Sequence, residues 1–365
     1  MNITFIIGNG FDLGLGLKTS YRDFISRYTD FSRPHDPYTL EYKLKEQINR
    51  NKLSWADAEV AYARLPFDSI LEDYDNFDRK FLELLSGFQH SLEKYLESEV
   101  NRCSFYSINH GMQIKAVRQI FSSSIEGLPA EQNKLCLEKL IGGSHLVRSI
   151  NFNYTETFDA LICPRAYEIS IPFQDGYFGI ETSEVVHVHG TLSNHNSIFG
   201  VTDAKHIRSE QARDLCRLTS TFLKEETDRE MSLGGYSSAL AVINDADVIV
   251  IFGTSMGLSD SAWWSSVVSC LKKNVELRVF IYDYIDNPQE ATSQIDRKLL
   301  QKRGREALLR SLPYREDEVQ MRDVWPCVDR IVVLADGPYT RMDGTKGMGD
   351  PWDLSAWSKK FISRS

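Results

Sequence analysis

Short apolar runs separated by longer helical patterns organise this chain. Each run is rich in Val, Ile and Phe and lacks the alternation of a half-exposed strand, which is typical of strands buried on both faces of a parallel sheet. Five runs predict strands and a sixth, near the C-terminus, is a further candidate: Ile3–Ile7, Val147–Asn153, Val185–His189, Asp247–Phe252, Leu277–Tyr282 and Arg330–Leu334. The pattern predicts an α/β fold, Rossmann-like, with a mainly parallel sheet and helices on both faces.

The longest helical interval separates the first two predicted strands. Residues 35–145 carry helical patterns and no clear strand. The clearest apolar stripe, which we expect to be core packing, runs along Phe77, Phe81, Leu84, Phe88, Leu92 and Tyr95. We therefore predict a sheet domain of residues 1–34 and 146–335, a large helical insertion over 35–145 and a C-terminal tail over 336–365. The alternative is that this segment forms a small all-α domain.

The amino-acid composition limits the kinds of molecule that this chain is expected to bind. Of 365 residues, 42% are hydrophobic and 25% charged, as in ordinary globular proteins, and a net charge of −9 makes nucleic-acid binding unlikely. The six cysteines are scattered without a C-x-x-C pair, so we expect no metal. No charged segment or cleavage site precedes the first predicted strand at residue 3, so we expect no signal peptide, and no apolar run is long enough to span a membrane. We expect a cytoplasmic protein that does not bind membranes.

Four of the predicted strands end in polar residues, and three of these endings contain glycine. The endings are Gly8-Asn9-Gly10, Asn151-Phe152-Asn153-Tyr154-Thr155, His187-Val188-His189-Gly190-Thr191, and Gly253-Thr254-Ser255 followed by Ser259-Asp260. Because parallel strands bring their carboxyl ends to one edge of a sheet, where such folds bind ligands, the endings predict one nucleotide-type pocket.

The first ending is the candidate phosphate loop. Gly8 and Gly10 can adopt positive φ, which would leave their backbone N–H groups free to face a phosphate in front of the next helix. The third glycine is Gly14, one position late for the usual dinucleotide fingerprint. The spacing of the three glycines therefore also fits an ordinary turn between a strand and a helix.

Acidic residues near the endings have two readings each. Asp12 either accepts from a ribose hydroxyl or caps a helix. For Asp260, which follows Ser259 just before a predicted helix, we favour a role at the helix N-cap over contact with a ligand. Asp283 stands either where an adenosine ribose acceptor would lie or at the start of a turn. Trp55 and Glu59, one helical turn apart, predict a buried anchor or a lid over the pocket. The expected nucleotide-binding residues are Gly8, Asn9, Gly10, Asp12, Gly253, Thr254, Ser255, Asp260 and Asp283.

Two side chains at strand ends are candidates for catalysis. Residues i and i+2 of a strand share a face, so Asn151 should point with Asn153 and His187 with His189, the later member lying nearer the ligand. We expect Asn153 and His189 to be catalytic, because an amide can orient water and ribose and an imidazole can accept a proton near neutral pH. Each alone also fits a turn asparagine or a structural histidine.

With these endings, the chain resembles the AbiH family of bacterial abortive infection proteins, within the broader sirtuin-like group of NAD-binding folds. The matching segments are Ile6-Ile7-Gly8-Asn9-Gly10-Phe11-Asp12, Gly16-Leu17-Lys18-Thr19-Ser20-Tyr21, Asn151-Phe152-Asn153-Tyr154-Thr155, His187-Val188-His189-Gly190 and Phe252-Gly253-Thr254-Ser255-Met256-Gly257-Leu258-Ser259-Asp260. The resemblance implies defence against bacteriophage by arresting or killing the infected cell. It also implies NAD chemistry at Asn153 and His189, which match the strand-end asparagine and the His-Gly histidine of sirtuin-like proteins.

These expectations combine into an NAD glycohydrolase that releases nicotinamide from NAD, its substrate, without a metal. The chain lacks the four-cysteine zinc module of sirtuin-like deacylases, which argues against deacylation, and Thr155 replaces an aspartate found in many relatives. Because uncontrolled loss of NAD would kill the host, we expect control by homo-oligomerisation or by a phage-derived activator. The main alternative is a non-catalytic module that senses NAD or ADP-ribose through a partner. A nucleic-acid-targeting toxin is less favoured.

Overall fold

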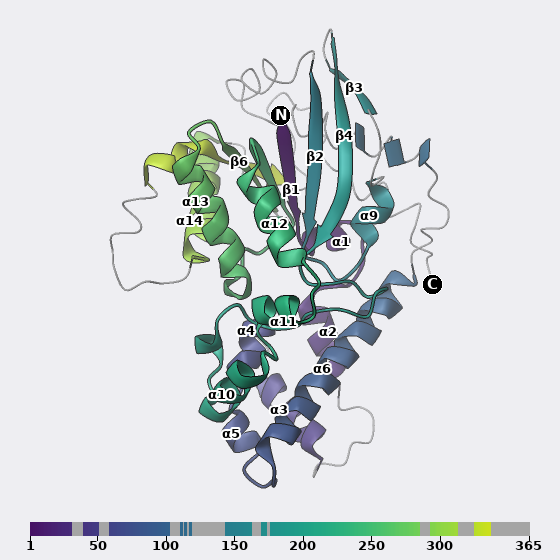
Figure 1. The fold of residues 1–365 in the computed structure, drawn as a ribbon, viewed down its shortest axis with the longest axis vertical. Helices are drawn as coiled ribbons and strands as arrows, with labels where there is room; N and C mark the ends of the chain where they lie inside the picture. The colour runs from purple at the N-terminus through teal and green to yellow at the C-terminus, as the bar shows by residue number, and fades with distance from the viewer. Residues whose placement is uncertain are drawn as a thin grey trace.

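The computed structural model describes most of the chain. The described residues are 1–30, 39–50, 58–102, 110–111, 113–114, 117–118, 143–162, 169–173, 176–284, 293–312 and 325–336. Within them, a sheet covered by helices lies beside a separate group of helices (Figure 1). Trp55 and all but the first residue of the predicted tail lie outside the described residues.

One sheet of seven strands forms the centre of the described structure. The strand order is β3-β4-β2-β1-β5-β6-β7. Every pairing is parallel except that of β3 with β4. The strands are β1 (Asn2–Ile7), β2 (Ser144–Asn151), β3 (Ile169–Phe173), β4 (Gly176–His187), β5 (Val248–Phe252), β6 (Arg278–Tyr284) and β7 (Ile331–Asp336). The predicted α/β fold with a mainly parallel sheet is confirmed.

All six predicted strands are present, and one further strand was missed. The missed strand is β3, a short antiparallel edge strand that contains Pro172. A proline interrupts the apolar signal, yet an edge position tolerates it because one side of an edge strand needs no N–H donor. β2 and β4 end at Asn151 and His187, two residues earlier than predicted. This difference changes where the candidate catalytic side chains point.

Helices cover both faces of the sheet, as predicted. Alternate residues of β1 divide between the faces: Phe5 and Ile7 pack with α1 (Gly10–Gly14) and α9 (Thr157–Leu161), whereas Ile6 packs on the opposite side. That second side is covered by α12 (Gly235–Asn244), α13 (Ser261–Lys273) and α14 (Gln294–Arg310) (Figure 1). The sheet is therefore buried on both sides, which explains its continuous apolar runs.

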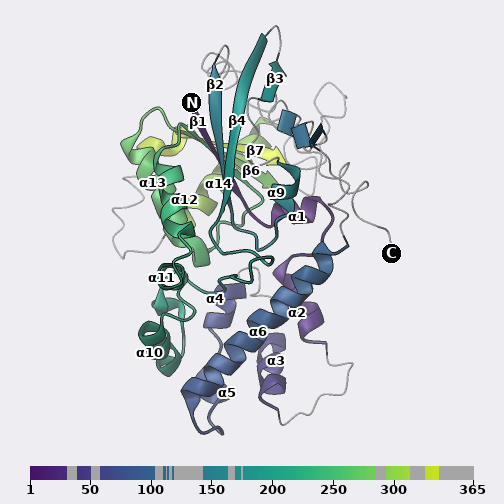
Figure 2. The ribbon, with the colours of Figure 1, turned by 45° about the vertical axis from the view of Figure 1, so that its right-hand side comes forward.

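A further group of helices packs around a hydrophobic core that is separate from those on the two faces of the sheet. We call this group of helices the helical body. It consists of α2 (Tyr21–Tyr28), α3 (Leu40–Arg50), α4 (Ala58–Ala63), α5 (Phe67–Ile70), α6 (Phe77–Val100), η3 (Ala204–His206), α10 (Glu210–Thr219) and α11 (Lys224–Glu230). Figures 1 and 2 show that it lies below the carboxyl ends of the central strands. The predicted insertion supplies α3 to α6, but α2, η3, α10 and α11 come from segments before and after it.

The long helix α6 organises the helical body. Its predicted stripe is buried from Phe81 to Tyr95, and Phe77 stacks on Phe81 at the start of the helix. Asn76 caps the N-terminal end of the helix. Its side chain accepts from the Arg79 backbone N–H at 3.2 Å and so gives this N–H the partner that it lacks within the helix. Among the described residues, no helix has the length and apolar character needed to cross a membrane.

Candidate functional site

The loops after β1 and β5 interlock through their glycines. The Gly8 N–H donates to the carbonyl oxygen of Phe252 at 2.9 Å, and the Gly10 N–H donates to that of Gly253 at 2.7 Å. A Cβ on Gly10 would lie 2.4 Å from the Gly253 Cα. Positive φ occurs at Gly253, with a value of 68°, rather than at Gly8 or Gly10. The predicted phosphate loop is thus corrected: both N–H groups are engaged, and the glycines permit close contact between two loops.

Three other predicted nucleotide contacts lie along the outer edge of these loops. Asn9 exchanges two hydrogen bonds with Thr19, donating to its carbonyl at 3.1 Å and accepting from its hydroxyl at 2.6 Å. The Thr254 hydroxyl accepts from the Met256 N–H at 2.9 Å, and Ser255 is exposed. Of the predicted contacts, Thr254 and Ser255 are therefore among the more accessible.

Asp12 lies fully buried on α1 rather than at a solvent-facing ribose site. Its carboxylate accepts hydrogen bonds from the hydroxyls of Thr155, at 2.6 Å, and Thr157. Burial raises the pKa of Asp12 to about 6, although both threonine hydrogen bonds act to lower it. The aspartate therefore joins the β1 loop to the segment after β2, and the predicted ribose contact is replaced by these threonines.

The prediction that residues i and i+2 share a face of the strand does not extend to the candidate catalytic residues, because both strands end before them. His187 Nε2 lies 3.0 Å from Asp159 Oδ1 on α9, whereas the ring of His189 packs against that of Phe152, with centroids 5.4 Å apart. The reason is that β4 ends at His187, so His189 lies in a turn and no longer follows the alternation of a strand. Asn153 likewise follows the end of β2.

Asn153 and His189 nevertheless come to the same edge of the sheet. The Asn153 amide nitrogen donates to the carbonyl oxygen of Gly8 at 3.2 Å, and the Asn153 N–H donates to Asn151 Oδ1 at 2.9 Å. His189 Nδ1 lies 3.0 Å from the carbonyl oxygen of Phe152, the residue before Asn153. The amide and the imidazole are 6% and 4% exposed, so both are held below the surface.

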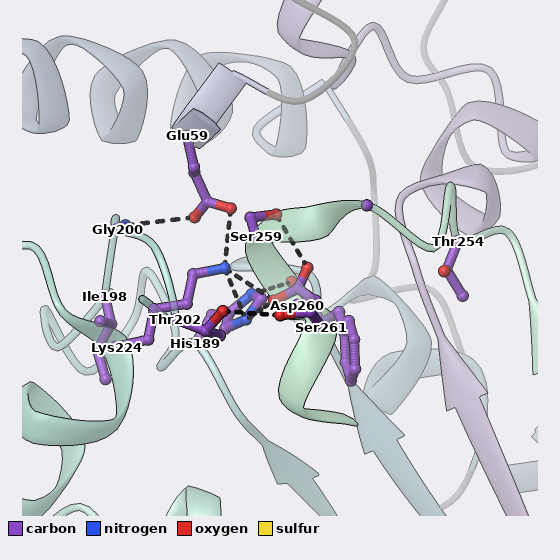
Figure 3. Close-up of polar contacts among 12 residues, drawn as sticks. Glu59, His189, Ile198, Gly200, Thr202, Lys224, Thr254, Ser259, Asp260 and Ser261 are labelled. Atoms are coloured by element: carbon purple, nitrogen blue, oxygen red, sulfur yellow. Dashed lines mark hydrogen bonds and ion pairs between the residues drawn. The ribbon is translucent and has the colours of Figure 1, made fainter. Parts of the chain in front are cut away.

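His189 belongs to a buried cluster of charged side chains that joins the sheet to the helical body. Its Nε2 lies 3.0 Å from Asp260 Oδ1 and 3.2 Å from Lys224 Nζ. Lys224 also reaches Asp260 Oδ1 and Glu59 Oε2, each at 2.8 Å. Figure 3 shows the ammonium between Glu59 of α4 and Asp260 at the start of α13, with Thr254 lying apart. We refer to Glu59, His189, Lys224 and Asp260 as the charge cluster.

Neighbouring polar groups complete the hydrogen bonding of Glu59. The Tyr154 hydroxyl lies 3.2 Å from Glu59 Oε1 and 3.1 Å from the carbonyl oxygen of Ile198, and the Gly200 N–H donates to the same carboxylate oxygen at 3.4 Å. Glu59 and Lys224 are 3% and 5% exposed. Water cannot easily replace these contacts, so the carboxylate depends on its protein partners.

The two ionised partners of Lys224 dominate the electrostatics. Burial acts to lower the pKa of Lys224, but the charges and hydrogen bonds of Asp260 and Glu59 raise it above its usual value. Burial acts to raise the pKa of Asp260, but the Lys224 charge and contacts from His189 and Lys224 lower it overall. Both groups therefore stay charged at neutral pH. The Asp260 side chain forms these contacts instead of a helix cap.

Asp283 is not brought into this cluster. It lies on β6, where its carboxylate is 2.7 Å from Arg303 Nε of α14. In this structure Asp283 forms an ion pair with a covering helix, and its ribose contact stays a prediction. Within the described part of the chain, no three or more His, Cys, Asp or Glu side chains are arranged to hold a metal ion.

Lys224 is the member of the charge cluster that the sequence did not indicate. It follows the apolar pair Phe222-Leu223 and starts the polar stretch of α11, which is typical of an exposed helix. Glu59 was predicted as an anchor or a lid, and its burial and contacts correspond to an anchor. The sequence signal that could have led to Lys224 was the predicted burial of Glu59, because a buried carboxylate requires a cationic or donor partner.

The comparisons with known proteins identify a family. The family model described as bacteriophage abortive infection AbiH matches residues 4–282. A search of curated proteins finds no significant match. The matched region includes β2 to β5, most of β1 and of β6, the helical body and all four residues of the charge cluster. Since the match extends over well over half of the sequence, this chain belongs to the AbiH family of bacteriophage abortive infection proteins.

Proposed function

We propose that this chain is an antiphage effector, related to sirtuin-like NAD-binding proteins, that hydrolyses NAD and releases nicotinamide. The observation that carries the proposal is the placement of Asn153 and His189 at one edge of the sheet: the imidazole contacts the backbone carbonyl of Phe152 at 3.0 Å, and the amide of the next residue donates to the carbonyl of Gly8 in the β1 loop. This is the edge at which open parallel sheets bind ligands. Membership of the AbiH family supports the role in defence.

The proposed reaction breaks the bond between nicotinamide and C1′ of the ribose. The bonding electron pair leaves with nicotinamide, which departs neutral, and water forms the new bond to the positively charged C1′. Asn153 donates through its nitrogen to Gly8, and this bond leaves its Oδ1 to orient water or a ribose hydroxyl. His189 accepts the proton of the attacking water, a role that typically contributes about a hundred- to ten-thousandfold in rate.

The electrostatics of the charge cluster favour such a transition state. Its fixed charges are the carboxylates of Glu59 and Asp260 and the ammonium of Lys224, so one negative charge is in excess. A buried negative charge stabilises positive charge that develops nearby on the ribose. The cluster therefore suits cleavage through a cation-like ribose better than attack on a phosphate.

Burial of the two candidate catalytic residues has a consequence for access. With exposed fractions of 6% for Asn153 and 4% for His189, NAD must displace part of the surrounding loops to reach them. We propose that assembly or a phage-derived component opens this edge. The same burial favours a second candidate function, a module that binds NAD or ADP-ribose without cleaving it and acts through a partner.

Mass spectrometry after incubation with NAD, NADP, ATP and RNA tests the proposal. We expect NAD to be consumed and nicotinamide to appear, with and without phage lysate as a source of activator. Asn153→Ala and His189→Ala should each lower the rate at least about a hundredfold. Matched controls are Asn194→Ala and His90→Ala, which change exposed residues of the same types.

The outcomes separate the candidate functions. Thermal unfolding of each variant shows whether lost activity reflects lost structure. Undiminished turnover by both folded variants would reject the mechanism. Tight binding of NAD or ADP-ribose by calorimetry, without product under either condition, would select the sensing module. Consumption of RNA instead of NAD would reject both.

A further inference from the structure

Each nitrogen of the His189 ring faces a different kind of partner. Nδ1 lies 3.0 Å from the carbonyl oxygen of Phe152. A carbonyl oxygen can accept a hydrogen bond but cannot donate one, so Nδ1 carries a proton. In the neutral ring, the lone pair is therefore on Nε2, which is the nitrogen that points into the charge cluster.

The partners of Nε2 suit both protonation states of the ring. Nε2, Asp260 Oδ1 and Lys224 Nζ form a triangle with sides of 3.0, 3.2 and 2.8 Å. When Nε2 carries a lone pair, the ammonium of Lys224 can donate to it. When Nε2 carries a proton, the carboxylate of Asp260 can accept from it. Asp260 alone would leave the neutral form without a donor.

The surroundings fix Lys224 in this place. Glu59 holds the ammonium from the opposite side at 2.8 Å and is itself held by Tyr154 and Gly200. The other groups packed on the His189 ring are the aromatic rings of Phe152 and Tyr154, with centroids at 5.4 and 6.1 Å. Because the exposed fractions of His189 and Lys224 are 4% and 5%, bulk water is not an alternative donor.

We propose that Lys224 is a positioning residue that keeps His189 neutral, with Nε2 as its proton-accepting atom, and that Asp260 stabilises the ring once it is protonated. This inference rests on the proposed NAD hydrolysis. When the loops open to admit NAD, Lys224 keeps its contacts with Glu59 and Asp260, and the attacking water takes the place of the ammonium at the lone pair and transfers its proton to Nε2. The resulting N–H donates to Asp260 Oδ1, the hydroxide electron pair forms the bond to C1′, and nicotinamide leaves with its bonding pair.

The test uses nitrogen-15 NMR of the histidine rings in the full chain across pH. The signals of His189 are assigned by their loss in His189→Gln. In the wild-type protein, the neutral ring should be the Nδ1–H form. In the double variant Lys224→Met/Glu59→Gln, the ammonium that donates to Nε2 is gone while the Asp260 carboxylate remains, so the share of His189 rings that carry a proton on both nitrogens should increase at neutral pH.

The double variant is chosen to preserve charge and packing. Two carboxylates and one ammonium become one carboxylate, so the excess stays at one negative charge. The amide oxygen introduced by Glu59→Gln still accepts from Tyr154 and Gly200. The control is Lys205→Met, which removes an exposed lysine paired with Asp203 and should leave the ring signals of His189 unchanged.

The outcomes distinguish this inference from the proposed function. An Nε2–H form in the wild-type protein, which is measured without any variant, would overturn the positioning role. So would an unchanged share of doubly protonated His189 rings in the folded double variant. If the ring signals behave as expected but NAD is not cleaved, the proposed function fails while the positioning role of Lys224 stands. If NAD is cleaved, the rate at neutral pH should fall in the double variant together with the share of neutral rings.

Discussion

At the scale of single residues, Asp12 and the side chains of the charge cluster are paired with residues that lie far away in sequence. Asp12 binds threonines more than a hundred positions later, and Lys224 binds a glutamate of α4 and an aspartate before α13. Such partners give each side chain a defined place at the sheet edge, because a buried charge without a partner would be strongly unfavourable. The same partners make the pH dependence of the protein assignable to individual groups.

Replacing Asp12 by asparagine should change how stability depends on pH. The folded pKa of Asp12 is about 6, raised from 3.8 by burial, so the folded state binds a proton more tightly than the unfolded state. Its contribution to stability is present below pH 4 and is lost as the pH rises through 6. The free energy of unfolding of the wild type should therefore fall relative to Asp12→Asn by about 2–3 kcal/mol between pH 4 and pH 7.5.

Urea unfolding of both proteins at several pH values measures this difference. Groups that titrate identically in the two proteins cancel in the comparison. A difference in unfolding free energy that stays constant between pH 4 and pH 7.5 would show that Asp12 is not a buried, proton-binding carboxylate.

At the scale of elements, interlocked loops place the ends of the central strands. Gly8 and Gly10 were predicted to bind phosphate through free N–H groups, but these groups bind the ends of β5 and its loop. The glycines are needed because a backbone, rather than a ligand, lies against them. A sequence motif of this kind therefore fits both a phosphate loop and a loop-to-loop contact.

Alanine at position 10 should destabilise the protein strongly even without any ligand. The added Cβ would lie 2.4 Å from the Gly253 Cα, so one loop must shift, and we expect a loss of about 2–4 kcal/mol in the free energy of unfolding. The matched control is Gly87→Ala on α6, where a Cβ meets nothing within 4 Å. That change should stabilise the helix by up to about 1 kcal/mol.

Chemical unfolding in the absence of nucleotide distinguishes the two roles of Gly10. Equal stabilities of the wild type and Gly10→Ala would indicate that the glycine serves ligand binding instead of packing. Gly87→Ala shows the effect of the same added methyl group in open space.

The elements that could be predicted were those whose signal is local. The apolar runs predicted the six parallel strands, which are all strands of the sheet except β3. The apolar stripe of α6 predicted the buried face of that helix. β3 was missed because it is short and contains Pro172. The ends of β2 and β4 were placed two residues late, which turned His189 to the wrong face. The partners of Lys224 could not be predicted, because pairing across the fold leaves no local pattern.

At the scale of the whole molecule, the charge cluster connects the sheet to the helical body. Glu59 and Lys224 lie on α4 and α11 of the helical body, whereas His189 lies in the turn after β4 and Asp260 lies directly before α13. A change in how the helical body contacts the sheet would therefore move the groups around His189. This connection offers a route by which assembly or an activator could control the site.

Removing Lys224 alone should weaken both parts of the molecule together. Lys224→Met leaves the carboxylates of Glu59 and Asp260 buried near each other without their shared cation, and we expect a loss of about 3–5 kcal/mol. Adding Glu59→Gln removes one of these charges and should recover a substantial part of that loss, since breaking one partner of a buried pair costs more than replacing both. The two changes are therefore expected to be non-additive.

Two optical signals tell whether the cores respond as one unit. Trp263 and Trp264 are buried beside the sheet, and their fluorescence reports on that core when the other four of the six tryptophans are replaced by phenylalanine in both the reference protein and the variant. Circular dichroism reports on all helices, including those of the helical body. If the charge cluster couples the cores, the two signals should show one shared transition in the wild type and the same shared shift in Lys224→Met. Separate transitions in the wild type, or a shift confined to one signal, would mean that the cores unfold independently and that the cluster does not transmit changes between them.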